Sequence, residues 1–581
     1  MRNGEMPSQQ KFKMYLKNGY KGKEAFIMKN TKRARRAAAF AAAVVMAACA
    51  AIPMGSSFSA SAVATEHTIS FTGQEGTGTH TYQAYMIFSG TATANGFGEA
   101  VELQGIQWAN PTGAADFLKA LKDDTTIGSD FADCTTAAAV ADVLKGYSVN
   151  SDKAKAFADL AIANKGNLKA VGEAGSTITA TEDGYYVIEE TGVTAGTSTM
   201  TAHLLGVYDA SVGAEITVKS SLPTFEKKIM DSNDSGTTVQ DGSTNDKWQD
   251  SADHDFGDKV PFQLTGTLPG DYASYKQYKM VFHDNLQDGV YGSPENVKVY
   301  YKHGTDNAVE ISDANYTISK PNTADDGFAD THGDKTCNLE VNIANLKTAT
   351  GDVTLQAGDK IIVEYQAELS TKAKIGEEGN WNSGYLEYSN NPYHTGEGDT
   401  TSKTPEDMVV DFTYQLAVDK VDNADKPLEG AGFTLYKFNG TDYEAVGNEI
   451  TGVTKFEFKG VDAGKYKLVE TTVPKGFNKA EDLVFVVKAE HDETADAPTL
   501  KTLTVVSENG DSLTSTDSAA GKFVVTKNVG LAATKIINNS GSSLPSTGGI
   551  GTTMFYVGGG VLVAGAGVIL ITKKRAKKDA E

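Results

Sequence analysis

The chain has 581 residues, a length that allows roughly three or four domains. Hydrophobic residues make up 40% of it and charged residues 22%, a balance typical of folded, globular protein. The net charge is −22, and basic residues gather at the two ends, so the middle of the chain is strongly acidic. Because such a surface would repel the phosphates of nucleic acid, that class of partner is excluded.

The N-terminal segment, residues 1–64, has the pattern of a secretion signal. Basic residues at 32–36 precede an apolar run at 37–52, and small residues at 60–64 offer two overlapping cleavage sites. Met28 is an alternative start of translation, because the preceding residues are polar and basic in a way that is unusual ahead of such a signal.

Cysteine is scarce in the exported part of the chain. Only Cys134 and Cys337 follow the predicted cleavage sites, and they fall in different predicted domains. A disulfide within a domain is therefore not expected. An exported protein of this size needs another source of robustness.

Residues 65–221 combine predicted strands with predicted helices. Strands rich in β-branched and aromatic residues are predicted at 67–71, 82–88 and 183–189. Apolar side chains at helical spacing predict three helices. These side chains are Phe117, Leu118 and Leu121; Val140, Val143 and Leu144; and Phe157, Leu160 and Ala161.

Residues 222–410 and 411–541 have the pattern of two β domains. In the first of them, strands are predicted at 260–264, 278–283, 297–301 and 360–365. The polar stretch 231–250 is predicted to be a solvated surface loop. Residues 411–541 contain short strands at regular spacing, which is typical of a sandwich. These strands are predicted at 414–418, 432–436, 455–458, 465–469 and 483–487.

The C-terminal segment, residues 542–581, carries a five-residue motif directly before an apolar run and a basic tail. The motif is Leu544, Pro545, Ser546, Thr547 and Gly548. An apolar run at 550–571 follows, long enough for a membrane-spanning helix, and then a basic tail at 573–578 that the positive-inside rule keeps in the cytoplasm. A different interpretation is an ordinary membrane anchor with a chance motif.

This order of parts resembles the substrate signal of Gram-positive sortases. The resemblance implies cleavage between Thr547 and Gly548, followed by capture of the Thr547 carbonyl by an amine. The chain would then be covalently attached to the cell wall.

Three residues of the last predicted domain form a reactive pattern. Strand alternation turns Lys420 inward with Val418, and it places Glu470 on the same face as apolar neighbours. Asn538 ends the last predicted strand. A buried lysine loses its proton and a buried carboxyl keeps one, which prepares the amine to attack a carboxamide. The product would be a Lys–Asn isopeptide bond with loss of ammonia.

The same domain resembles the collagen-adhesin B-type (Cna-B) family. The resemblance rests on DKVD at 419–422, LEGAGF at 428–433 and YKLVETTVPKGF at 466–477. It implies that the strand lysine, the motif glutamate and a last-strand asparagine make the bond, with Glu470 as the promoting acid. Asn539 is a close competitor of Asn538 for the asparagine.

The middle predicted domain resembles the second domain of sortase-assembled major pilins. PTFEKK at 223–228 and YSNNP at 388–392 carry this resemblance. Alternation favours Lys227 over its neighbour Lys228, and it places Asn390 on the inner face. The resemblance therefore implies a bond from Lys227 to Asn390, with either Asp284 or the second-choice Asp258 as the promoting acid.

The first predicted domain lacks a lysine on its first strand, so no isopeptide bond is expected there. The family joins its subunits through a lysine near the end of this domain. Lys219, in ITVKS at 216–220, lies at that junction and is the expected intersubunit lysine, although the tyrosine–proline–lysine motif of the best-known members is missing.

The expected fold is therefore mainly β, with tandem immunoglobulin-like or Cna-type sandwiches, some helix in the first domain and a C-terminal transmembrane helix. The resemblance implies a major pilus subunit, or alternatively a singly wall-anchored adhesin or minor pilin. No enzyme active site, cofactor or metal site is expected. The implied partners are a pilus-specific and a housekeeping sortase, identical subunits, peptidoglycan, minor pilins and host receptors.

Overall fold

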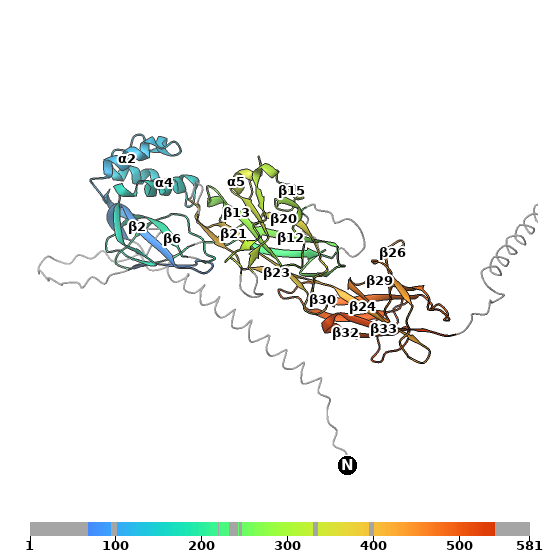
Figure 1. Ribbon diagram of the computed structural model, residues 1–581. Coiled ribbons are helices and arrows are strands. Elements are labelled where there is room, and N and C mark those ends of the chain that lie inside the picture. Colours follow the sequence, from blue (N-terminus) through green and yellow to red (C-terminus); the bar gives the residue numbers. More distant parts are fainter. Residues whose placement is uncertain are drawn as a thin grey trace, which may run out of the picture. The chain divides into compact units, whose positions relative to one another are not determined.

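The computed structural model describes residues 68–93, 102–194, 196–218, 220–231, 242, 247–328, 335–393 and 400–540. Within these ranges β-strands dominate, and every hydrogen-bonded sheet is built from one of three consecutive segments (Figure 1). We name these segments the first (68–217), middle (224–412) and last (414–538) domains. The predicted mainly β fold is confirmed. No helix in the described ranges is long and apolar enough to cross a membrane, and the predicted span at 550–571 lies outside them.

The first domain places three helices, at the predicted positions, beside a five-stranded sheet of order β3-β2-β6-β7 with β4 on β2 (Figure 1). A second sheet has the order β5-β1-β8. Thr136 and Ser151 cap two of the helices by accepting backbone N–H bonds, as their residue types favour. The helices are α2 (Ala114–Asp123), α3 (Ala137–Lys145) and α4 (Asp152–Ala163), with 3₁₀ turns η1 (Gly128–Phe131) and η2 (Lys165–Asn167). The strands are β1 (Thr68–Thr72), β2 (His80–Thr93), β3 (Glu102–Trp108), β4 (Lys169–Gly175), β5 (Thr177–Thr179), β6 (Gly184–Val193), β7 (Leu204–Tyr208) and β8 (Ala214–Thr217).

Strand β2 serves two cores because both of its faces are covered. Tyr82, Ala84 and Met86 pack into the core shared with the three-stranded sheet. Ile87 and Phe88 pack into the core beneath the helices. The register with β6 shifts between Met86 and Phe88, and such a bulge turns the following side chains to the other face.

The middle domain is a sandwich of two sheets. One has the order β10-β9-β12-β20-β14-β15, and the other has the order β11-β23-β21-β13-β19-β16 with β22 on β21. Their inner faces share one large core that includes Phe262, Val363, Phe282 and Leu386. The predicted loop 231–250 is wrong at its end, where Trp248–Gln249 pairs with β9 as β10.

Most elements of the middle domain are strands. They are β9 (Thr224–Met230), β10 (Trp248–Gln249), β11 (Ser251–Asp253), β12 (Lys259–Thr267), β13 (Met280–Leu286), β14 (Glu295–Lys302), β15 (Val309–Glu310), β16 (Thr317–Ser319), β17 (Thr323–Ala324), β18 (Thr336–Cys337), β19 (Leu339–Ile343), β20 (Lys360–Glu368), β21 (Asn380–Ser389), β22 (Thr401–Lys403) and β23 (Asp407–Phe412). Short helical turns are η3 (Tyr272–Ser274), η4 (Asp313–Asn315) and α5 (Leu346–Ala349).

The last domain is a second sandwich, with sheets of order β28-β24-β33-β32 and β26-β25-β29-β30-β31, and β27 on β25. Its first and last strands pair in parallel, so that Lys420 lies opposite Ile536 and Asp422 opposite Asn538. The strands are β24 (Tyr414–Asp422), β25 (Gly432–Phe438), β26 (Tyr443–Ala445), β27 (Ile450–Thr451), β28 (Lys455–Val461), β29 (Gly464–Thr472), β30 (Leu483–His491), β31 (Leu500–Val506), β32 (Phe523–Thr526) and β33 (Leu531–Asn538), with the turn η5 (Lys527–Val529).

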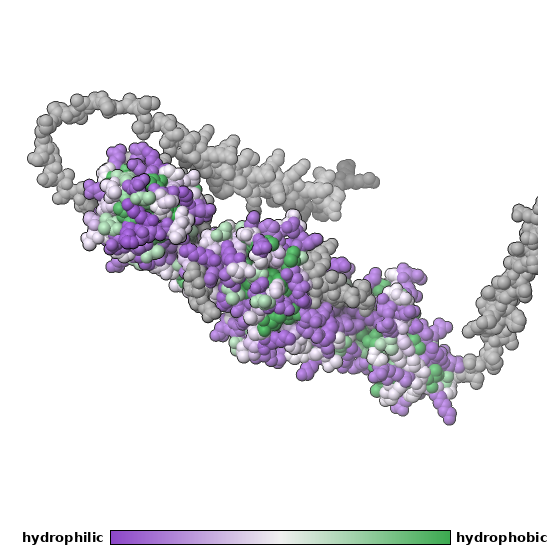
Figure 2. All heavy atoms as spheres, turned by 90° about the horizontal axis from the view of Figure 1, so that it is seen from above, coloured by the Kyte–Doolittle hydropathy of each residue, from purple (hydrophilic) through white to green (hydrophobic). Residues whose placement is uncertain are grey.

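The surface agrees with the acidic composition. Figure 2 shows a mainly hydrophilic face on which hydrophobic residues form small patches. Large apolar side chains lie in the cores of all three domains, as is usual in globular proteins.

Candidate cross-linking sites

Two lysines are buried completely. Among the described residues, Lys227 and Lys420 are 0% exposed, and the next most buried lysine, Lys437, is 7% exposed. Taking an ammonium group out of water is costly unless it is paired or loses its proton. Both fully buried lysines are those predicted from the sequence, and each lies beside a buried carboxyl group and a buried carboxamide.

In the middle domain, Lys227 contacts Asp284 through Nζ and Oδ2. The hydroxyl of Tyr365 donates to the other carboxyl oxygen of Asp284 at 2.8 Å. Asn382 in turn donates from Nδ2 to the Tyr365 oxygen at 2.7 Å. The Lys227 Nζ lies 5.3 Å from the centre of the Phe262 ring. An amine, a carboxyl group and a carboxamide thus meet in an aromatic-lined interior.

Strand pairing explains this meeting. Lys227 is on β9, opposite Leu264 of the neighbouring β12. Asp284 is on β13 of the other sheet, opposite Gly384 of β21, and Asn382 lies two residues before that glycine on the same face. The two sheets therefore present the amine and the carboxyl group from opposite sides of the core.

Burial changes the protonation of this pair. It lowers the pKa of Lys227 below that of an ordinary lysine, although the charge of Asp284 opposes the change. It raises the pKa of Asp284 above that of an ordinary aspartate, against the opposing effect of Lys227. Both shifts favour the neutral amine and the protonated acid that amide exchange requires.

The structure does not bring the predicted partner Asn390 to Lys227. The Nδ2 of Asn390 donates to Ser402 Oγ at 2.9 Å, and its Oδ1 accepts from Thr400 Oγ1 at 2.7 Å. Along an extended chain it lies roughly 20 Å beyond Gly384, the residue opposite Asp284. Since Lys227 contacts Asp284, the Asn390 carboxamide is out of its reach, and the expected pairing is corrected.

Asn382 is a buried carboxamide near Lys227 that the sequence did not single out. It shares an alternation face with Leu386 and Tyr388, the same signal that singled out Asn390. It is fully buried, and its Oδ1 has no hydrogen-bond partner among the described residues. The sequence alone does not say which of two asparagines on one face lies nearer to Asp284, because that depends on the register of β21 with β13.

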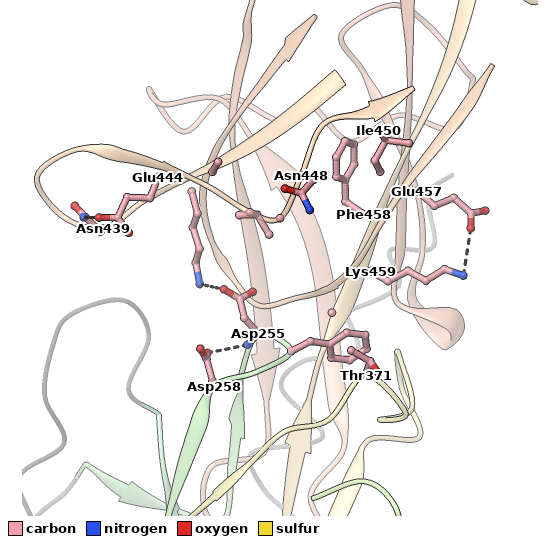
Figure 3. A pocket seen from close by; sticks show the side chains of 16 residues that line it. Asp255, Asp258, Thr371, Asn439, Glu444, Asn448, Ile450, Glu457, Phe458 and Lys459 are labelled. Carbon is pink, nitrogen blue, oxygen red and sulfur yellow. Dashed lines mark hydrogen bonds and ion pairs between the residues drawn. The ribbon is translucent and has the colours of Figure 1, made fainter. Parts of the chain in front are cut away.

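Lys228 and Asp258, the second choices for the lysine and the acid of the middle domain, lie away from this site. Lys228 is half-buried and pairs with Asp250. Asp258 accepts a backbone N–H bond from Asp255 at 3.0 Å and lines a pocket of about 630 Å³ (Figure 3). Lys437 also lines this pocket and donates to Asp255 at 2.7 Å.

In the last domain the three predicted residues come together. Asn538 donates from Nδ2 to Glu470 Oε1 at 2.7 Å, while its Oδ1 has no partner among the described residues. Lys420 Nζ lies 3.1 Å from the carbonyl oxygen of Val421 and 3.4 Å from that of Ile536, two residues before Asn538. Burial lowers the pKa of Lys420, and the charge of Glu470 opposes this.

Asn539, the competitor, is exposed at the surface, whereas Asn538 is 1% exposed. The second oxygen of Glu470 accepts the backbone N–H of Ala480 at 2.7 Å, which fixes the carboxyl group toward the asparagine. The arrangement favours Asn538 over Asn539 for reaction with Lys420.

Some predicted residues lie outside the described ranges. Lys219 is one of them, and so are Leu544, Pro545, Ser546, Thr547 and Gly548. The structure thus tests neither the intersubunit lysine nor the shape of the sorting motif.

Two known families match the C-terminal part of the chain. Residues 414–499 match the SpaA family, described as a prealbumin-like fold domain. The last domain is prealbumin-like. Residues 536–579 match the LPXTG cell wall anchor motif, which confirms the predicted sorting signal and attachment to the Gram-positive cell wall.

Among curated proteins, the trypsin-resistant surface T6 protein of Streptococcus pyogenes serotype M6 is 28% identical over 280 residues, which are 46% of this chain and 46% of that protein. The chain thus matches about half the length of this relative. Among solved structures, the T6 backbone pilin of the same organism has a TM-score of 0.41 and 18% identity, covering 82% of this chain and 99% of the other. The major pilin SpaD of Corynebacterium diphtheriae has a TM-score of 0.40 and 16% identity, covering 82% and 98%. The two family matches and the curated surface protein agree with the resemblance to sortase-anchored Gram-positive surface proteins that the sequence motifs indicated.

Proposed function

We propose that this chain is the backbone subunit of a covalently polymerised pilus on a Gram-positive cell wall. The cell-wall anchor motif supports the attachment, and the similarity to a surface protein of Streptococcus pyogenes supports the class. The two buried lysine sites are the strongest support for the proposal. Cross-links at these sites would stop the domains from extending under load, which a fibre one subunit wide requires.

Polymerisation would proceed by acyl transfer. A cysteine thiolate of the pilus sortase attacks the Thr547 carbonyl, the bond to Gly548 breaks, and a thioacyl intermediate forms. The amine of Lys219 of the adjoining subunit attacks this intermediate, releases the thiolate and leaves an amide from Thr547 to Lys219. A housekeeping sortase would pass the last subunit to a peptidoglycan amine. In each step the chain is the substrate and not the enzyme.

The internal bonds would form without any enzyme. In the middle domain the neutral amine of Lys227 attacks the side-chain carbonyl of Asn382, and the protonated Asp284 polarises that carbonyl. A C–N bond forms, the bond to the amide nitrogen breaks, and ammonia leaves with the displaced proton. In the last domain Lys420, Glu470 and Asn538 would take the same roles.

The experiment is an immunoblot of wall extracts from cells that carry the matching sortase. A high-mass ladder is expected for the natural chain, and its loss is expected for Lys219→Ala. Lys119→Ala is the matched control, because Lys119 is a strongly exposed lysine of the first domain and should leave the ladder intact. A single monomer band from the natural chain would instead support a singly anchored adhesin or minor pilin.

A further inference from the structure

Strand β13 carries a second cluster on the face opposite to Asp284. His283 Nδ1 lies 3.1 Å from Asp325 Oδ2 and 3.9 Å from Cys337 Sγ. One potential ligand atom from each of these three residues lies within 4.8 Å of the others. We propose that His283, Asp325 and Cys337 bind a divalent transition-metal ion of the zinc type.

The spacing of the three atoms suits such an ion. Zinc binds imidazole nitrogen and carboxylate oxygen at about 2.0–2.2 Å and thiolate sulfur at about 2.3 Å, in tetrahedral geometry. Ligand atoms on one zinc are therefore roughly 3–4 Å apart, close to the two distances measured from the imidazole. Modest side-chain movement would bring all three onto one ion.

Each ligand is held by the fold. His283 is on β13, between β19 and β21, and its ring stacks on Tyr385 with centroids 4.5 Å apart and planes at 4°. Cys337 is on β18, 2% exposed. Asp325 follows β17, where it accepts bonds from the Gly327 N–H at 2.7 Å and from the Tyr385 hydroxyl at 2.9 Å.

A second carboxylate orients the imidazole. Glu387 Oε2 lies 3.3 Å from His283 Nε2, the ring nitrogen that faces away from Cys337, and Glu387 is itself bound by Lys279 at 3.1 Å. Histidine ligands of metals commonly donate their other N–H to a carboxylate, which fixes the tautomer that leaves the ligating nitrogen free. Glu387 is placed for this role.

The donor set selects the class of ion. A thiolate and an imidazole favour zinc and related transition metals, whereas calcium and magnesium prefer oxygen ligands. With the thiol deprotonated, one thiolate and one carboxylate balance the two charges of the ion. The Asp325 side chain is 22% exposed, which gives an ion and a water ligand access from the surface.

Its position beside a histidine distinguishes Cys337 from Cys134, the other buried free cysteine of the described chain. Cys337 is a free thiol in a chain that the secretion signal and wall anchor send to an oxidising compartment, where unpaired cysteines are unusual. Metal ligation would account for a buried thiol beside a histidine. The ion would tie the short β17–β18 hairpin to β13, and thus reinforce the middle domain on the face opposite to the Lys227–Asp284 pair.

The test uses the exported full chain, purified in detergent, treated with chelator and then incubated with Zn²⁺ or Co²⁺. About one ion per chain is expected after removal of free metal, as measured by elemental analysis. Bound Co²⁺ should show the near-ultraviolet absorption of a thiolate–cobalt bond. Cys337→Ser should abolish this absorption and weaken zinc binding at least tenfold, and Glu387→Gln should weaken binding roughly 10–100-fold.

Cys134→Ser is the matched control, because Cys134 is the other buried free cysteine of the described chain and lies in the first domain. It should leave both the stoichiometry and the cobalt spectrum unchanged. The proposal is overturned if the natural chain retains no zinc, if Co²⁺ binds without thiolate absorption, or if Ca²⁺ is retained and Zn²⁺ is not. These three results come from the natural chain, so they hold even where a variant fails to fold.

Discussion

Replacing Asn382 with alanine removes the carboxamide that hydrogen bonds through Tyr365 and Asp284 connect to Lys227. Without it the proposed bond to Lys227 cannot form, and we expect the middle domain to be less stable. Asn390→Ala is the matched variant, since it removes a carboxamide from the same face of the same segment but one that hydrogen-bonds Ser402 and Thr400 instead. The pair of variants therefore separates the structural assignment from the sequence-based one.

The size of the effect follows from the loop that the bond closes. A cross-link between Lys227 and Asn382 closes a loop of roughly 150 residues, for which the chain-entropy relation gives about 5 kcal/mol of stabilisation. In a domain of this size that corresponds to a fall of roughly 10–20 °C in the unfolding temperature. Asn390→Ala loses hydrogen bonds worth about 1–3 kcal/mol and should shift the unfolding temperature by a smaller amount.

Intact-mass measurement gives the direct readout. Each bond releases one ammonia, about 17 Da, so the natural chain should weigh about 34 Da less than its processed sequence. Asn382→Ala should retain a deficit of about 17 Da relative to its own sequence, from the last domain alone, and Asn390→Ala should retain about 34 Da. Digestion should yield a branched peptide that joins Lys227 to Asn382.

Two results would refute this reasoning. A natural chain of full sequence mass would show that neither buried lysine reacts. A deficit halved in Asn390→Ala and intact in Asn382→Ala would show that the strand register places the wrong asparagine beside Asp284. Thermal unfolding alone cannot decide, because both variants remove hydrogen bonds, so the mass takes precedence.

Three further predictions concern the last domain, the anchor and a partly buried acid of the middle domain. Asn538→Ala should remove one mass deficit of about 17 Da and Asn539→Ala none, which intact-mass measurement of both variants checks. Thr547→Ala should block sortase cleavage, so cell fractionation should find the chain in the membrane and not in the wall. Burial raises the pKa of Asp271 to about 6 in the folded chain, above the value of about 4 expected when unfolded. The folded state therefore favours the protonated side chain. The stability of the middle domain should be highest below about pH 4 and fall as the pH rises through about 6. Urea unfolding across this range should show a flatter profile for Asp271→Asn, and an equal slope in both proteins would contradict the assignment.

Several parts of this protein depend only on local pattern and could be predicted from the chain alone. The order of motif, apolar run and basic tail identified the wall anchor without any structure, because a sorting signal is read as an extended peptide. Alternation along single strands was enough to turn Lys227 and Lys420 inward, since the side-chain period of a strand is two. The last-strand position of Asn538 followed in the same way.

Other parts depend on pairing between distant strands, and these needed the folded structure. Asn382 and Asn390 have the same alternation, and only the register of β21 with β13 shows that Asn382, two residues from the partner of Asp284, is the nearer one. The meeting of His283, Asp325 and Cys337 has the same origin, because a short hairpin folds back on the outer face of a strand that comes some forty residues earlier in the chain. The face to which each side chain of one strand points can be predicted from the sequence, whereas the register between two strands depends on the packing of the whole sandwich.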